Sequence, residues 1–234
     1  MSQSLDTDFT LHLHEDRDES VRGQSFAAAR SLKRALLDEL RRWGFDGSDG
    51  DFPGSAGHVS VPQGDARLLA DLGIGLEATD ITPLHAARLG LVAATGWSVE
   101  PSLLAGDSGP LGLRPRAFDL PPPERVLDPA HAAFLRSSML GVAVYGTASG
   151  VAPLDYPVAM KTGTAAAWRV GYHVNYVGVA PAQDPEVAFC VRLTHAPNSP
   201  AASRAGREVL ALLLQGLAER SRRAQRAAAA IAGG

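Results

Sequence analysis

The residues best suited to chemistry in this 234-residue sequence form the string Lys-Thr-Gly-Thr at positions 161–164, directly after a short apolar run. Lys161 supplies a positive charge and hydrogen-bond donors, and it is one of only two lysines in the chain. On a strand, Thr162 and Thr164 point to the same side, and Gly163 between them leaves room for a ligand backbone. The backbone N–H of Thr164 is suited to an oxyanion. Together these groups predict a site for a carboxylate-bearing acyl substrate laid along a strand edge.

The same string also has a purely structural interpretation. In that interpretation Lys161 is a solvated strand residue and Gly163 marks a bulge. A four-residue match does not decide between the two, so the surrounding elements must. A second candidate pair, His12 and His14, lies on the polar face of the alternating segment 8–14. No third ligand is placed by the sequence, so we predict no metal site and no cofactor.

Composition excludes several functional classes. Charged residues make up 20% of the chain and the net charge is −3, which gives no electrostatic footprint for nucleic acid or for a membrane surface. A single cysteine, Cys190, excludes an internal disulfide, and its apolar neighbours predict a buried position. No apolar stretch reaches the roughly 18 residues of a transmembrane helix. The acidic N-terminus lacks the apolar region of a secretory signal, so we expect a cytosolic chain or a piece of something longer.

Apolar residues at three- and four-residue spacings predict four helices, over residues 24–43, 83–95, 129–145 and 203–229. Gly44 is placed to end the first helix, and Thr82 and Asp128 are placed to cap the second and third. Strands are expected over 8–14, 158–164, 173–180 and 186–195, with a short hairpin loop joining the last two.

This order of elements predicts an α+β fold, with an antiparallel sheet of about three to five strands and flanking helices. We divide the chain into an N-terminal strand and charged connector (1–19), one main domain (20–222) and a frayed tail (223–234). His85, on the helix over 83–95, is interpreted as a surface or boundary residue.

Several segments resemble the transpeptidase domain of penicillin-binding proteins, and they occur in the right order. The string at 161–164 resembles the Lys-Thr-Gly element of that family and of the serine β-lactamases. Further similarity lies in a helix end (36–47), a Thr-Pro-Leu helix start (75–104), a Gly-Thr-Ala segment (137–150) and a terminal hairpin (176–193). The resemblance covers about residues 20–220. It implies the C-terminal part of that fold, with Lys161, Thr162, Gly163 and Thr164 binding a peptidoglycan stem peptide or a β-lactam.

The resemblance does not supply a nucleophile. The family carries it in Ser-x-x-Lys, because a serine hydroxyl is a weak nucleophile without an adjacent proton acceptor. Lys33 and Lys161 are preceded at that spacing by Arg30 and Val158, so the motif is absent. At the place expected for the family's Ser-x-Asn motif stands Ser20, with an arginine two residues later, which cannot both donate and accept as asparagine does. A solvated serine in a charged linker is the alternative interpretation of Ser20.

Three functions remain open. The first is a truncated or degenerate transpeptidase-like domain, a pseudoenzyme that keeps a carboxylate-binding groove but transfers no acyl group alone. The second is one half of a split transpeptidase, completed by a partner chain. The third is a non-catalytic protein-interaction module whose open sheet edge binds a strand. Missing strands would expose an edge that segment 8–14 or a protein partner completes. The family acts in the cell envelope, whereas this sequence shows no export signal.

Overall fold

The computed structural model describes residues 19–47, 56–60, 72, 79–102, 106–107, 116–117, 121–167 and 171–232. The helices are α1 (Glu19–Arg42), α3 (Pro83–Thr95), α4 (Pro129–Val144) and α5 (Ser199–Ala232). The long strands are β7 (Ala159–Ala167), β8 (Gly171–Ala180) and β9 (Val187–Ala196). The strand predicted over 8–14, with His12 and His14, lies outside the described residues.

The long strands form one antiparallel sheet in the order β7-β8-β9. Lys161 is opposite Val177, which is opposite Cys190. Three pairs of two-residue strands complete the described sheets: β1 (His58–Val59) with β2 (Thr79–Asp80), β3 (Trp97–Ser98) with β6 (Glu124–Arg125), and β4 (Gly106–Asp107) with β5 (Arg116–Ala117). The α+β class with a small antiparallel sheet is therefore confirmed.

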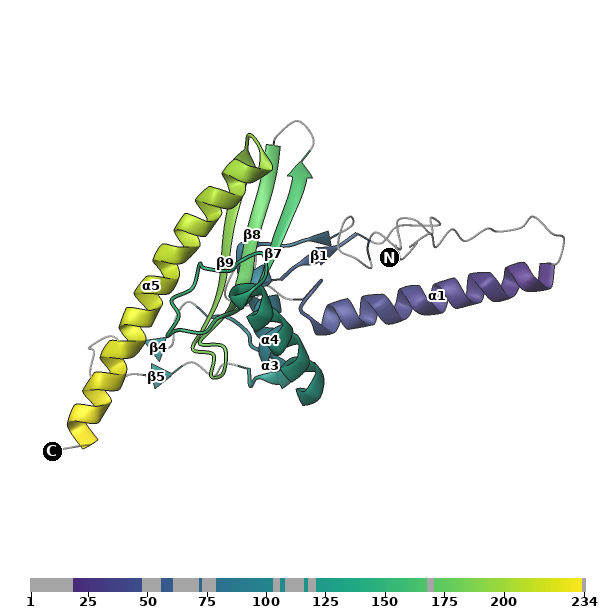
Figure 1. The fold of residues 1–234 in the computed structure, drawn as a ribbon. Helices are drawn as coiled ribbons and strands as arrows, with labels where there is room; N and C mark the ends of the chain where they lie inside the picture. The colour runs from purple at the N-terminus through teal and green to yellow at the C-terminus, as the bar shows by residue number, and fades with distance from the viewer. Residues whose placement is uncertain are drawn as a thin grey trace, which may run out of the picture.

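Helices cover both faces of the main sheet, as Figure 1 shows. Because successive side chains of a strand point to opposite faces, β7 alternates between two apolar clusters. Ala159 packs with Ala94 of α3 and Met139 of α4. Met160 packs in the other cluster, with Leu210 and Leu214 of α5. The sheet is thus the middle layer between α3 with α4 and the long helix α5.

The helix ends follow the chemistry read from the sequence. The Thr82 side chain accepts a hydrogen bond from the backbone N–H of His85, and the Asp128 side chain accepts one from Ala130. Gly96 ends α3 in the left-handed conformation, at φ 79°. Gly44, after α1, has φ 89° and donates its N–H to the carbonyl of Arg41. These local signals explain why α3 and α4 begin where the sequence predicts.

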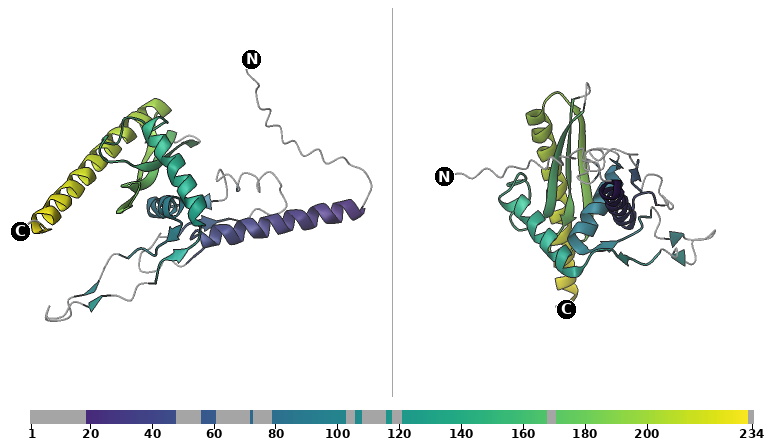
Figure 2. Two further views of the ribbon diagram at one scale, coloured as in Figure 1. Left: turned by 60° about the horizontal axis from the view of Figure 1, so that its bottom comes forward. Right: turned by 90° about the vertical axis from the view of Figure 1, so that its right-hand side faces the viewer.

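One helix, α1, projects away from the sheet, as the left view of Figure 2 shows. Its 24 residues span about 36 Å, and only its C-terminal end is held by the rest of the fold. There the Arg42 side chain donates from Nη2 to the carbonyl of Val126 at 3.1 Å. Leu32, in the apolar stripe of this helix, is 64% exposed. Leu36, Leu37 and Leu40, nearer the C-terminal end, are half-buried, so the apolar stripe becomes covered toward that end.

The interpretation of His85 as a surface or boundary residue is wrong, because the side chain is fully buried. The ring of Phe45 stands edge-on to the imidazole, with ring centroids 4.6 Å apart. Gly57 lies so close that a Cβ there would come within 2.8 Å of His85 Nε2. Phe45 follows α1 and Gly57 precedes β1, and an isolated parallel β-bridge joins the two residues. The periodicity of the α3 segment cannot predict that these two residues cover His85.

The last helix is longer than predicted, since α5 begins at Ser199 and continues to Ala232. The division of the chain after residues 19 and 222 stays a prediction. In the part of the chain that the structure describes, no helix is both long and apolar enough to cross a membrane.

The contact between α5 and β8 depends on Gly206. A Cβ at Gly206 would lie 2.6 Å from Cε2 of Tyr176, whose ring is buried and whose hydroxyl donates to the Ser203 carbonyl at 3.0 Å. Burial raises the pKa of the Tyr176 hydroxyl, which keeps this donor protonated. The helix therefore rests directly on the aromatic ring.

We predict that Gly206→Ala destabilises the fold by about 1–3 kcal/mol, because the methyl group overpacks a ring that cannot move aside. Gly216→Ala, in the same helix, is the matched control. A Cβ there meets nothing within 4 Å, so the gain in helix propensity of about 0.5–1 kcal/mol should raise stability. Urea denaturation followed by circular dichroism measures both. Equal effects of the two substitutions would contradict a close α5–β8 contact.

Candidate functional site

The string at 161–164 lies in the middle of β7, at an edge of the sheet. β7 pairs with β8 along one side, and no strand among the described residues pairs with its other side. Lys161, Gly163 and Thr164 are exposed, and Thr162 is half-buried. A strand edge offers backbone N–H and C=O groups to a second extended chain. The site residues thus stand where a peptide could be added to the sheet.

The four residues divide between the two faces of the sheet. Thr162 and Thr164 follow Met160 and point to the face of α5, while Lys161 and Gly163 follow Ala159 and point to the face of α3 and α4. A Cβ built on Gly163 meets nothing within 4 Å, so the surface beside Lys161 is open. The two threonines share a face as predicted, and the lysine reaches the edge from the other face.

Lys161 folds back along its own strand. Its Nζ donates to the backbone carbonyl of Thr162 at 2.6 Å. This contact holds the ammonium group against the backbone of β7 at Thr162. The partner is a carbonyl and not a hydroxyl. The described residues thus give Lys161 an electrostatic role at the edge without showing it beside a serine that it could activate.

Sequence reasoning missed Thr147 as a site residue. Its hydroxyl oxygen lies 2.6 Å from that of Thr162, which is a hydrogen bond. Thr147 belongs to the loop that follows α4, within the Gly-Thr-Ala segment whose resemblance to the family was noted above. That resemblance is the sequence signal that could have pointed to Thr147, but it does not predict a contact with Thr162. The loop therefore limits how freely the Thr162 side chain can turn.

The fold does not bring Ser20 to this strand. Ser20 is the second residue of α1, whose C-terminal end is the one joined to the rest of the fold. Figure 1 shows the N-terminal end of α1 directed away from the sheet. The backbone of Ser20 thus lies at the far end of α1 from the residues that join this helix to the fold.

Cys190 is the other side chain with nucleophilic chemistry on the face of Lys161. The two residues are separated by Val177 on the middle strand, so they lie about 10 Å apart across the sheet. Burial raises the pKa of the Cys190 thiol, which disfavours the reactive thiolate. The described residues also contain no group of three or more His, Cys, Asp or Glu side chains placed to hold a metal ion.

The two threonines of the string should differ in their effect on stability. We predict that Thr162→Val lowers the free energy of unfolding by about 0.5–1.5 kcal/mol, because it removes the bond to Thr147. Thr164→Val, on the same face of the same strand, should change it by less than about 0.5 kcal/mol, because Thr164 is exposed. Both keep a β-branched residue on the strand. Urea denaturation measures the difference, and a larger effect at Thr164 would contradict the geometry.

Comparisons with known proteins agree with this architecture. The family model described as the penicillin binding protein transpeptidase domain matches residues 25–215. The chain is similar to the D,D-transpeptidase domain of a peptidoglycan glycosyltransferase from Eggerthella lenta, at 24% identity and a TM-score of 0.60, over 79% of this chain and 49% of that one. It is also similar to penicillin-binding protein A from M. tuberculosis, solved as an imipenem acyl-enzyme complex, at 26% identity and a TM-score of 0.57.

The match to penicillin-binding protein A covers 74% of this chain and 41% of that one. A peptidoglycan synthetase from Bifidobacterium adolescentis matches at 20% identity and a TM-score of 0.63, over 79% of this chain and 36% of that one. This chain thus spans less than half the length of each of these three structures. A comparison with curated proteins found no match. Because the family model covers most of the sequence, from residue 25 to residue 215, the chain belongs to the family of penicillin-binding protein transpeptidase domains.

Proposed function

We propose that this domain binds a carboxylate-bearing acyl peptide, such as a peptidoglycan stem peptide or a β-lactam, along the outer edge of β7, and that it transfers no acyl group by itself. The observation that carries the proposal is the edge of β7 that no described strand pairs, together with the exposed side chains of Lys161 and Thr164 on that strand. We take residues 20–222 as the extent of the domain, and the family match lies within these limits.

The chemistry of the edge favours an extended ligand that ends in a carboxylate. A peptide laid beside β7 gains main-chain hydrogen bonds, as in other cases of strand addition. The ammonium group of Lys161 then offers a charge-assisted bond to a carboxylate, and such bonds are roughly twice as strong as neutral ones. Gly163 leaves the surface next to the lysine open to the ligand. Lys161, Thr162, Gly163 and Thr164 are thus the proposed binding residues.

The absence of Ser-x-x-Lys from the sequence supports the second half of the proposal. Acyl transfer by this family's chemistry needs a serine with a proton acceptor beside it. Neither Lys33 nor Lys161 has a hydroxyl-bearing residue three positions before it, and Lys161 Nζ is bonded to a carbonyl. The domain therefore has a binding strand without a nucleophile at that strand, so binding is expected to be reversible.

A binding experiment on the full 234-residue chain tests the proposal. Titration with a synthetic peptidoglycan stem peptide, followed by isothermal calorimetry, should show reversible binding that Lys161→Met weakens by roughly 10- to 100-fold, since a hydrogen bond to a charged group contributes about 1.5–3 kcal/mol. Lys33→Met, which removes the only other lysine, should leave the affinity unchanged. Fluorescent penicillin should leave no label on the chain after denaturing electrophoresis.

A second variant separates loss of binding from loss of folding. Gly163→Ala adds a methyl group where the protein has nothing within 4 Å, so it should keep the stability of the parent while blocking a ligand that runs past Lys161. Affinity that is unaffected by both Gly163→Ala and Lys161→Met would refute the binding site. A penicillin label that survives denaturation would refute the lack of acyl transfer.

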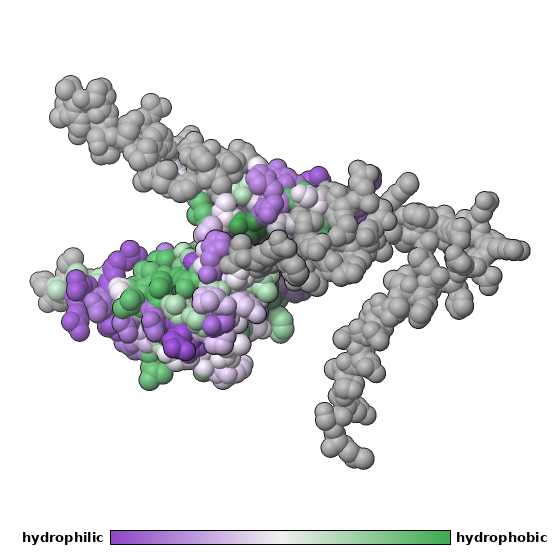
Figure 3. All heavy atoms as spheres, turned by 90° about the horizontal axis from the view of Figure 1, so that it is seen from above, coloured by the Kyte–Doolittle hydropathy of each residue, from purple (hydrophilic) through white to green (hydrophobic). Residues whose placement is uncertain are grey.

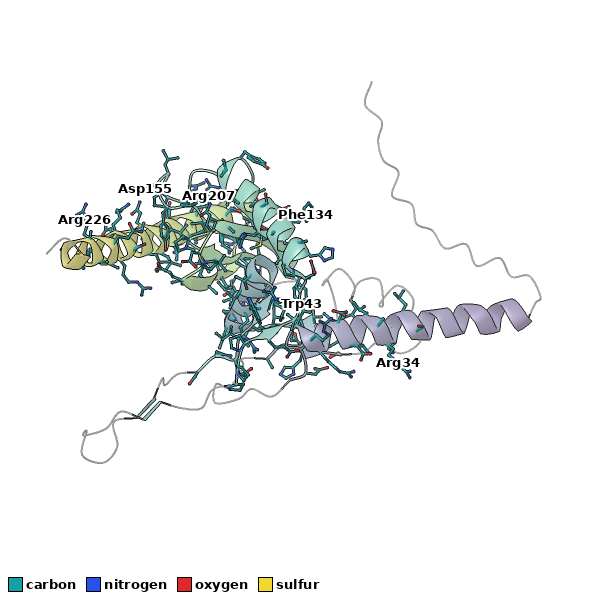
Figure 4. The ribbon with its side chains drawn as sticks, turned by 90° about the horizontal axis from the view of Figure 1, so that it is seen from below. Arg34, Trp43, Phe134, Asp155, Arg207 and Arg226 are labelled. Carbon is teal, nitrogen blue, oxygen red and sulfur yellow. The ribbon has the colours of Figure 1, made fainter. Side chains whose placement is uncertain are left out.

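A second candidate function is one half of a transpeptidase that a partner chain completes. It is favoured by large apolar side chains that stand exposed on α4 and at its end. Phe134, Val144 and Tyr145 are 68%, 65% and 83% exposed. Phe134 points away from the body of the fold in Figure 4, and Figure 3 shows apolar residues, in green, on the described surface. Side chains of this size are usually covered when a protein has its full complement of partners.

Reconstitution tests this second candidate. A chain that carries the Ser-x-x-Lys part of a transpeptidase domain should become labelled by fluorescent penicillin only when it is mixed with this protein. Replacing that serine by alanine should abolish the label, and Lys161→Met in this protein should reduce it. Phe134→Ser should weaken the association, because it removes an exposed aromatic anchor. Labelling of the partner alone to the same extent would exclude a split enzyme.

The third candidate, a non-catalytic interaction module, would bind a protein strand through backbone groups at an open edge. β9 is favoured for this role, since it pairs only with β8 among the strands that the structure describes. Lys161→Glu discriminates between the candidates, because it reverses the charge that a carboxylate needs and leaves the backbone of β9 unchanged. Partner binding that survives this substitution would favour the module over the carboxylate groove.

A further inference from the structure

The loop at the end of α4 is held by a residue far along the chain. Arg207 of α5 donates from Nη1 to the carbonyl of Thr147 at 2.9 Å and from Nη2 to the carbonyl of Ser149 at 2.5 Å. Figure 4 labels this arginine on α5. The planar guanidinium group has its donors in a rigid fork, so two simultaneous bonds fix the direction of both carbonyls. One side chain of α5 thereby sets the course of the loop.

The loop passes this constraint to the strand. Ala148, between the two carbonyls, is fully buried in the cluster that α5 forms with the sheet, so the loop is anchored on its inner side. Thr147 then presents its hydroxyl to Thr162 at 2.6 Å, and the Thr162 carbonyl accepts the bond from Lys161 Nζ. Hydrogen bonds therefore link Arg207 to Thr147, Thr147 to Thr162, and Thr162 to Lys161.

The part of α5 that carries Arg207 is packed tightly against the sheet. Gly206, the residue before Arg207, lies against the ring of Tyr176 on β8, and Tyr176 in turn donates to the Ser203 carbonyl. The backbone that carries Arg207 is therefore fixed to the middle strand of the same sheet that carries Lys161. A side chain on such a fixed backbone can hold the loop at a constant distance from β7.

We infer that Arg207 is a positioning residue of the β7 groove: it holds the loop at 146–150 so that Thr147 orients Thr162 beside Lys161. Its effect on ligand affinity rests on the function proposed above, whereas its effect on the loop does not. The two hydrogen bonds of Arg207 described above go to the loop and not to β7, so it acts through Thr147. The family resemblance of the segment at 137–150 gives no role to any residue of α5, and this assignment comes from the contacts alone.

Hydrogen exchange and binding, measured on the full chain, test the inference. Arg207→Met should speed amide exchange in the loop at 146–151 and around Thr162, and should weaken binding of the synthetic stem peptide about tenfold. Arg207→Lys should restore part of the protection, because an ammonium group can reach one of the two carbonyls. The rest of β8 and β9 should exchange as in the parent protein.

Arg222→Met is the matched control. Arg222 also lies on α5 and holds a nearby segment, through an ion pair of 2.6 Å with Asp155, but it makes no bond to the loop at 146–150. It should change neither the exchange near Thr162 nor the affinity. Unchanged exchange in the loop of Arg207→Met would overturn the inference, as would equal effects of both substitutions over the whole sheet. If the parent chain does not bind the peptide, the proposed function fails, and the exchange data alone decide the role of Arg207.

Discussion

The packing of α5 against the sheet is the interaction on which the rest of the described fold depends. A three-stranded sheet has two apolar faces, and α5 packs on one of them through Leu210 and Leu214, which are fully buried in one cluster with Met160 and Val174. Complete burial of a side chain of this size contributes about 1.5–3 kcal/mol. Gly206 allows the helix to approach Tyr176, and the same approach brings Arg207 to the loop beside β7. Stability and the geometry of the site thus have a common origin.

Because the sheet is small, its strand edges can bind a peptide but can also pair with an unwanted chain. With three strands, two edges remain without a described strand partner, one on β7 and one on β9. An open edge can accept a peptide, and it can also pair with an unwanted chain. On β7 the exposed side chains include Lys161 and Thr164, whereas on β9 Phe189 and Val191 are buried and Arg192, Thr194 and His195 are exposed. The two edges are therefore chemically different surfaces.

The site separates binding from chemistry. Under the proposed function, Lys161 and the threonines supply the charge and the hydrogen bonds that bind a carboxylate along the strand. Acyl transfer needs in addition a nucleophile and a base at the same place. The relatives in the comparisons are more than twice as long as the part of them that this chain covers. Leu32 of α1 and Phe134 and Val144 of α4 are large apolar side chains that stand exposed.

The sequence by itself determined what depends on near neighbours. Alternation and periodicity located β7, β8, β9 and α3, and the caps at Thr82 and Gly96 placed the helix ends, because each signal acts within a few residues. The order of short motifs indicated the family. Only the tertiary structure decided that His85 is buried under Phe45, that Thr147 meets Thr162, and that Arg207 holds that loop from 60 residues away. Such contacts depend on how whole helices, strands and loops pack together, and a local pattern of residue types cannot predict contacts between residues so far apart in the sequence.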